Sequence, residues 1–209
     1  MAKQASMART IAWYHRIAPI YDWLCGPLYA RPRRGALQML DLQPGETVVD
    51  LGCGTGLSLP GLSKAVGNHG KVIALDATSR MLKRAQRRCE RQGLNNVQLV
   101  AGDLLAQDFA PSLKNELHAA DAIVCSYVLA ITPQWREFFA AAKALQKPGG
   151  RFVLVDTRPL QGGWRWLNPL VVPIANWSGA GDIARPTWLL GHAASLRSYW
   201  GGFVFVALA

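Results

Sequence analysis

The chain has 209 residues, of which 50% are hydrophobic and 17% charged, and its formal net charge is +10. This length suffices for one sizeable core and is too short for two, so we expect a single domain over residues 1–209. The four cysteines stand singly, without the spacing of a metal site or a disulfide framework, which favours a reducing, cytoplasmic compartment. We identify no signal peptide and no apolar run of about 18 residues, so neither export nor membrane spanning is expected.

Residues 1–40 combine basic and aromatic side chains. They hold six basic residues against one acidic residue, and tryptophans and tyrosines recur among them. This composition is typical of a helical cap packed over an active site. It also suits a segment that contacts the head groups of an anionic membrane, and both interpretations stay open here.

An apolar run enters a glycine-rich turn at residues 48–56, with the sequence VVDLGCGTG. The β-branched start suits a buried parallel strand, and the alternating glycines let the backbone turn sharply and approach a ligand closely. A dinucleotide fingerprint needs Gly-x-Gly-x-x-Gly, whereas the third glycine here, Gly56, comes one residue early. The turn therefore predicts a nucleoside site rather than a pyrophosphate cradle.

The remaining pattern alternates strands and helices. It predicts an α/β, Rossmann-like fold with a seven-stranded, mostly parallel sheet, helices on both faces and a closing antiparallel hairpin. The expected helices span 57–66, from Thr78 or Ser79 to a stop at Gly93, and 134–145. The expected strands after the glycine turn span 71–75, 96–100, 121–125 and 152–156, followed by the hairpin strands 196–200 and 203–207.

The segment from Asp50 to Gly56 (DLGCGTG) resembles the glycine loop of the class I S-adenosylmethionine-dependent methyltransferases. The resemblance implies S-adenosylmethionine as the cofactor. Asp76 ends the next strand, where an acidic residue can accept hydrogen bonds from both ribose hydroxyls. We prefer this role to helix capping, for which Thr78 and Ser79 are better placed.

The same resemblance places the other parts of the cofactor. Asp103 would accept the adenine amino group, unless it is an ordinary turn residue. Met81 would contact the ribose or adenine, or simply pack. Ser126 and the residues that follow it, Tyr127 to Leu129, would face the methyl group or the methionine end. The predicted cofactor site comprises Asp50, Gly52, Gly54, Gly56, Asp76, Ala77, Met81, Asp103, Leu104 and Ser126.

Residues 13–22 resemble the entry segment of the quinone and phospholipid methyltransferases, in which a tyrosine pair covers the cofactor. Residues 56–60 extend the likeness to the bacterial phosphatidylethanolamine N-methyltransferase group. Tyr14 and Tyr21 lie seven apart and would share one helix face, so with Ser126 they are the predicted catalytic residues. A tyrosine hydroxyl, Asp22 or His15 could take the proton of an amine acceptor.

Two further segments could have either a functional or a purely structural role. Residues 158–192 form a tryptophan-rich insertion with the composition of a lid or an interfacial patch, or of a buried loop. Its stretch 167–174 is apolar but broken by prolines, so we expect no plain helix there. The basic run between Arg80 and Arg91 is expected to be a solvated helix face, and no nucleic-acid partner is expected.

These observations predict a peripheral enzyme on the inner membrane face that methylates the head-group amine of a lipid, with phosphatidylethanolamine as the leading candidate. Aromatic side chains near both ends of the fold could hold the quaternary ammonium product by cation–π attraction. The alternative is a methyltransferase for a quinone or another hydrophobic small molecule. A third hypothesis is a cofactor-binding protein without catalysis; the oligomeric state is left open.

Overall fold

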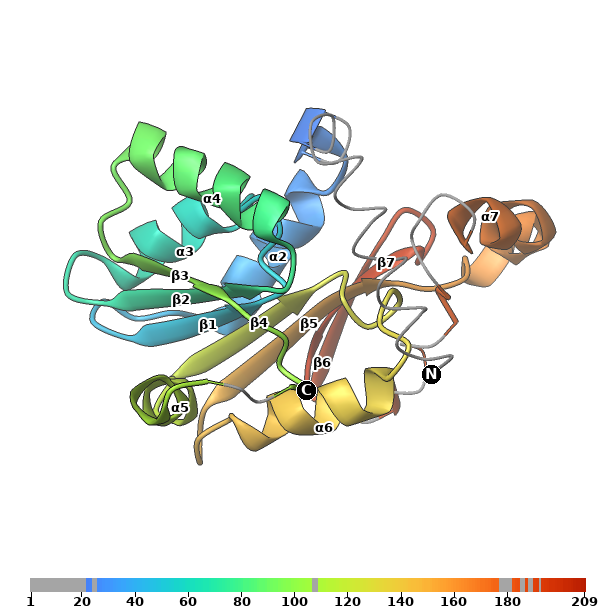
Figure 1. Cartoon of the computed structure of the whole chain (residues 1–209). Coiled ribbons are helices and arrows are strands. Elements are labelled where there is room, and N and C mark those ends of the chain that lie inside the picture. Colours follow the sequence, from blue (N-terminus) through green and yellow to red (C-terminus); the bar gives the residue numbers. More distant parts are fainter. Residues whose placement is uncertain are drawn as a thin grey trace.

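The computed structural model describes residues 22–23, 26–106, 109–176, 182–184, 187, 190–191 and 193–209. Its strands are β1 (Thr47–Leu51), β2 (Lys71–Asp76), β3 (Val97–Ala101), β4 (Ala122–Ser126), β5 (Arg151–Thr157), β6 (Ser195–Tyr199) and β7 (Val204–Leu208). They form one sheet in the order β3-β2-β1-β4-β5-β7-β6 (Figure 1). Strands β1 to β5 run parallel, whereas β7 is antiparallel to both β5 and β6.

Helices cover both faces of this sheet (Figure 1). One face carries α2 (Ala30–Leu40), α3 (Leu59–Val66) and α4 (Ser79–Gln92), and the other carries α5 (Pro111–His118) and α6 (Trp135–Ala144). Successive strand residues face opposite layers: Val48 packs with α2 and α3, and Val49 packs with the layer that contains α5 and α6. Because parallel strands are covered on both faces, their apolar runs are continuous.

The predicted fold class is confirmed, including the parallel sheet and the closing hairpin. The hairpin turn lies at Gly201 and Gly202, which both have positive φ. Helix α4 ends at Gly93, in the left-handed conformation with a φ of 62°, as the sequence predicts.

Three local predictions need correction. Helix α3 begins at Leu59 rather than at residue 57, with Pro60 in its first turn, where the missing N–H costs no hydrogen bond. Helix α5 was not expected, because its eight residues offer only two leucines as an apolar face. The segment expected to be irregular forms the 3-10 helix η1 (Gly162–Leu167) and then α7 (Asn168–Ala175), with Pro173 inside α7.

The proposed cap over residues 1–40 also changes at its carboxyl end. Helix α2 packs against β5 and β7, and its Ala36 and Leu40 belong to the core. Residues 30–40 are therefore part of the sheet's covering layer. Most of the predicted cap lies outside the described residues.

Within the described residues, no helix combines the length and apolar character needed to cross a bilayer.

Candidate active site

The glycine loop after β1 lies against two other strand ends. The N–H groups of Gly52 and Cys53 both donate to the Leu75 carbonyl at 2.9 Å, which ties the loop to β2. Gly52 has a φ of +73°, and a Cβ there would lie 2.3 Å from Val128 Cγ2, after β4. Only glycine allows this combination of positive φ and close approach.

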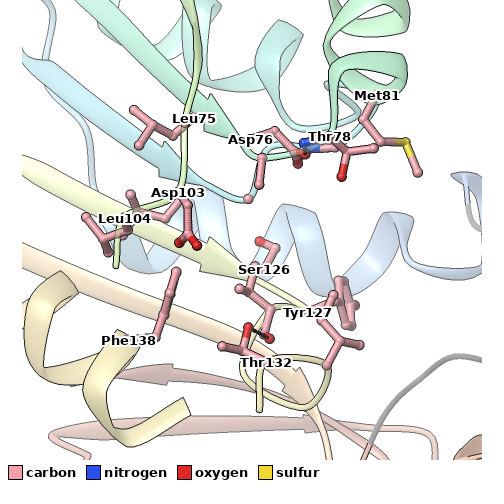
Figure 2. Close-up of a pocket in the computed structure, with 17 residues that line it drawn as sticks. Leu75, Asp76, Thr78, Met81, Asp103, Leu104, Ser126, Tyr127, Thr132 and Phe138 are labelled. Atoms are coloured by element: carbon pink, nitrogen blue, oxygen red, sulfur yellow. Dashed lines mark hydrogen bonds between the residues drawn. The ribbon is translucent and has the colours of Figure 1, made fainter. Parts of the chain in front are cut away.

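The loop forms one wall of a cavity at the carboxyl edge of the sheet, where ligands of open α/β sheets bind. Figure 2 shows side chains from the ends of β2 and β4, the loop after β3, α4 and α6 around this cavity. Eight of the ten predicted cofactor residues line it: Gly52, Gly54, Asp76, Ala77, Met81, Asp103, Leu104 and Ser126.

Asp76 is held in place by backbone groups. The Gly54 N–H donates to Asp76 Oδ2 at 2.8 Å, and the Thr78 N–H donates to Oδ1 at 2.7 Å. Burial raises the pKa of Asp76, and these hydrogen bonds partly offset that rise. A carboxylate fixed in this way keeps further lone pairs for ribose hydroxyls. Thr78 occupies the N-cap position of α4, but its side chain makes no capping hydrogen bond.

Asp103 and Ser126 flank the cavity from different strands (Figure 2). Asp103 Oδ1 accepts a hydrogen bond from the Leu105 N–H at 3.0 Å, as a turn residue does. It also lines the cavity beside the buried Leu104, so the turn role and the predicted adenine role are compatible.

Asp50 lies on a second, smaller cavity on the other side of the glycine loop, together with Arg33. It is 1% exposed, and neither of its carboxylate oxygens has a hydrogen-bond partner among the described residues. Burial, followed by the negative charge of Asp76, raises the pKa of Asp50 to about 7. Among the described residues, the site therefore holds a buried carboxyl group whose hydrogen-bonding capacity is unused, and an ammonium-bearing ligand could supply the missing donors.

Gly56 lies outside the lining of both cavities. A Cβ at this position would lie 2.7 Å from Leu59 Cδ1 and 3.3 Å from the Ala85 backbone. Its observed contacts pack the loop onto α3 and α4, which is how a third glycine serves helix packing. The predicted catalytic residues Tyr14 and Tyr21 lie outside the described residues, and so does His15.

Asp22, one of the candidates for the proton acceptor, has a carboxylate that two other residues already engage. Thr55 Oγ1 donates to Asp22 Oδ1 at 2.5 Å, and Arg88 Nη2 lies 2.6 Å from Oδ2. Arg88 Nε also donates to the Thr55 carbonyl at 3.0 Å. These three residues form a clasp that joins the segment before α2 to the glycine loop and α4.

Of the other residues of the site, Tyr127 and Val128 belong to the segment that the sequence predicts at the ligand edge, whereas Ile131 and Phe138 carry no sequence signal. Tyr127 lines both cavities and has a φ of 60°, a conformation uncommon for a large side chain and frequent at functional sites. Val128, Ile131 and Phe138 supply apolar surface to the main cavity. Arg33 lies in the basic amino-terminal segment, within the resemblance to the quinone and phospholipid methyltransferases, but the sequence predicts no contact between it and the cofactor.

Comparison with known proteins agrees with this geometry. The model of the methyltransferase domain family matches residues 48–150. A demethylmenaquinone methyltransferase from Oceanobacillus iheyensis is 33% identical over 134 residues, covering 64% of this chain and 54% of the relative. The chain thus spans about half the length of that relative.

Solved structures show the same fold. An S-adenosylmethionine-dependent methyltransferase from Aquifex aeolicus has a TM-score of 0.58 at 21% identity, covering 85% of this chain and 88% of the other. A geranyl diphosphate C-methyltransferase from Streptomyces coelicolor, solved with S-adenosylhomocysteine, has a TM-score of 0.64 at 16% identity, covering 88% and 79%. These matches and the site agree with a resemblance of the chain to the class I S-adenosylmethionine-dependent methyltransferases, and among them to the quinone methyltransferase group.

Proposed function

We propose that this chain transfers the methyl group of S-adenosylmethionine to a hydrophobic small molecule of the quinone type. The observation that carries the proposal is a cofactor-type site whose outer wall is apolar, in a chain similar to a demethylmenaquinone methyltransferase. Val128 and Ile131 follow β4, and Phe138 stands on α6. These three side chains offer an acceptor contact surface without charge.

The residues present fit the cofactor. Asp76, which lines the cavity, would accept hydrogen bonds from the ribose, and Asp103 and Leu104 would meet the adenine. Asp50, buried and without a hydrogen-bond partner among the described residues, would pair with the ammonium group of the methionine end. Arg33 lines the same small cavity and would attract its carboxylate.

When bound, the cofactor supplies an electrophilic methyl group on a sulfonium ion. Transfer of this methyl group to the acceptor would release S-adenosylhomocysteine and one proton from the acceptor. The protein's task is to hold the acceptor, the methyl carbon and the sulfur in line and to exclude water. Tyr127, whose φ of 60° is uncommon for a large side chain, lines both cavities, and its ring would stand beside this line.

The lipid head-group hypothesis is less well supported than the quinone alternative. The relative reported above is named for a quinone substrate, and the apolar wall provides no charge for an ethanolamine head group. Phosphatidylethanolamine therefore stays a prediction from the sequence.

A direct competition between acceptors tests the proposal. The full chain is incubated with methyl-labelled S-adenosylmethionine, a short-chain demethylated naphthoquinone kept reduced, and phosphatidylethanolamine in detergent. We expect label in the naphthoquinone only, and none with an Asp76→Ala variant. Label in the phospholipid alone would overturn the proposal in favour of the head-group hypothesis.

A further inference from the structure

Three segments that are distant in the sequence bring large apolar side chains together on the surface. The residues are exposed, Trp166 by 74% and Leu170 by 62%. We call this surface the tryptophan face and define it by six residues: Leu28, Trp164, Trp166, Leu170, Ile174 and Trp200. Figure 1 shows η1 and α7 beside the β6–β7 turn.

Printed contacts connect the segments. The Gln161 N–H donates to the Gly201 carbonyl at 2.8 Å, and the indole of Trp164 lies against Gly201, where a Cβ would be 2.9 Å away. The rings of Tyr29, which follows Leu28, and of Trp200 have centroids 6.1 Å apart. These contacts join the segment before α2, the β6–β7 turn and η1, which carry the residues of the tryptophan face.

Hydrogen bonds hold the backbone segments that carry these exposed side chains. Asn168 Oδ1 accepts from the Leu160 N–H at 2.7 Å, and Asn168 Nδ2 donates to the Leu160 carbonyl at 3.0 Å. Arg158 Nε donates to the Gly202 carbonyl at 2.9 Å and its Nη2 to Ser198 Oγ at 2.9 Å. The fold thus holds large apolar groups in water at a fixed place, which marks an interaction surface.

The charge around the tryptophan face has one sign. The three described segments that bear it, residues 26–40, 159–176 and 195–203, contain five arginines and no acidic residue. Arg165 is exposed between Trp164 and Trp166, and Arg31 and Arg34 are exposed on α2. Indole rings among basic side chains suit the head-group layer of an anionic bilayer, where the rings enter the apolar boundary and the charges meet lipid phosphate.

The tryptophan face also leads to the reaction site. Tyr127, which lines both cavities, lies 4.5 Å from Tyr29 between ring centroids, and Tyr29 contacts Trp200 on the face. A row of three aromatic rings thus runs from the methyl-transfer site to the exposed surface. An apolar acceptor dissolved in a bilayer would meet this row as it leaves the lipid.

We propose that the tryptophan face docks this protein on an anionic lipid bilayer and presents the acceptor path to it. The inference deepens the proposed function, because it names the medium from which the hydrophobic acceptor comes. Vesicle binding itself requires neither cofactor nor acceptor, so it can be tested separately.

The test measures flotation of the full chain, without cofactor, on phosphatidylcholine vesicles with and without phosphatidylglycerol. The double variant Trp166→Ser/Leu170→Ser should lower the partition coefficient about tenfold or more, since it removes most of the inserted apolar area. Arg165→Gln should lower binding about fivefold on vesicles with phosphatidylglycerol and leave binding to pure phosphatidylcholine unchanged. Trp166→Phe should retain most of the binding.

The matched control removes positive charge at the other edge of the sheet. Lys83 and Arg87 lie on the exposed face of α4, over β3 and β2. The variants Lys83→Gln and Arg87→Gln should each change binding to phosphatidylglycerol vesicles by no more than about twofold. Equal losses in the control and in Arg165→Gln would overturn the proposal in favour of nonspecific charge attraction. So would absence of wild-type binding to phosphatidylglycerol vesicles.

A second copy of the chain is the competing occupant. If Trp166→Ser/Leu170→Ser converts a dimer to a monomer in sedimentation velocity and leaves flotation unchanged, the tryptophan face is a subunit contact and the proposal is wrong. Methylation of a water-soluble short-chain quinone by the wild-type chain, measured without vesicles, tests the proposed function alone. If the wild-type chain binds vesicles but does not methylate this quinone, the proposed function is wrong and the docking surface stands.

Discussion

Replacing Asp50 by Asn tests whether the buried carboxylate beneath the glycine loop is reserved for the cofactor. Burial and the nearby charge of Asp76 raise the pKa of Asp50 from 3.8 to about 7. Between those pH values the folded chain binds more protons at this site than the unfolded chain does. The free energy of unfolding of the ligand-free wild type should therefore fall as the pH rises from about 4 to about 7, by up to about 4 kcal/mol.

Asn has nearly the shape of Asp and cannot ionise, so Asp50→Asn should lack this part of the pH dependence. Without ligand, it should be more stable than the wild type above about pH 7. Burial also raises the pKa of Asp156 to about 7, and that contribution is present in both chains. The difference between their urea unfolding curves, measured across this pH range, therefore isolates Asp50.

Although Asp50→Asn should stabilise the ligand-free chain at neutral pH, it should weaken cofactor binding. Loss of a charge-assisted hydrogen bond to the ammonium group, worth about 1.5–3 kcal/mol, should weaken S-adenosylmethionine binding at neutral pH at least tenfold in calorimetry. Asp41→Asn is the matched control, because Asp41 is exposed and its left-handed conformation suits Asn. Parallel unfolding curves together with unchanged affinity would refute the assignment of Asp50.

Three further substitutions probe the loop, the ribose contact and the clasp. Gly52→Ala should lower the free energy of unfolding by about 2 kcal/mol or more, because its Cβ meets Val128 at a positive φ; a denaturation midpoint equal to that of the wild type would contradict this. Asp76→Ala should weaken cofactor binding about 100-fold in calorimetry, since it removes the charged acceptor, and a loss below threefold would argue against ribose binding. Arg88→Met leaves Asp22 without its ion-pair partner and should lower thermal stability by about 1–3 kcal/mol; an unchanged melting temperature would show that the clasp contributes nothing.

Much of the cofactor half of the site follows from the sequence. The glycine turn, Asp76 and Asp103 each stand directly after an apolar strand, and parallel strands bring their carboxyl ends to one edge. Local spacing therefore sufficed to predict that these residues meet. It also located the hairpin, because Gly201-Gly202 separates two short strands.

Other features depend on packing between distant segments. Phe138 reaches the cavity because α6 crosses the far face of the sheet, and Tyr127 meets Tyr29 because α2 packs on β5 and β7. The clasp of Asp22, Thr55 and Arg88 joins three elements in the same way. Thr55 and Tyr127 stand in segments that the sequence predicts at the ligand edge, but spacing along the chain does not reveal which distant residues they contact.

The sequence by itself determined the fold class and the predicted site for the methyl donor, because both rest on periodicity and on motifs within a few residues. Only the tertiary structure decided which buried carboxylate has no hydrogen-bond partner among the described residues, what lines the main cavity, and where the exposed tryptophans lie. Burial and surface exposure are properties of the packed chain, since each side chain's surroundings come from segments far away in the sequence.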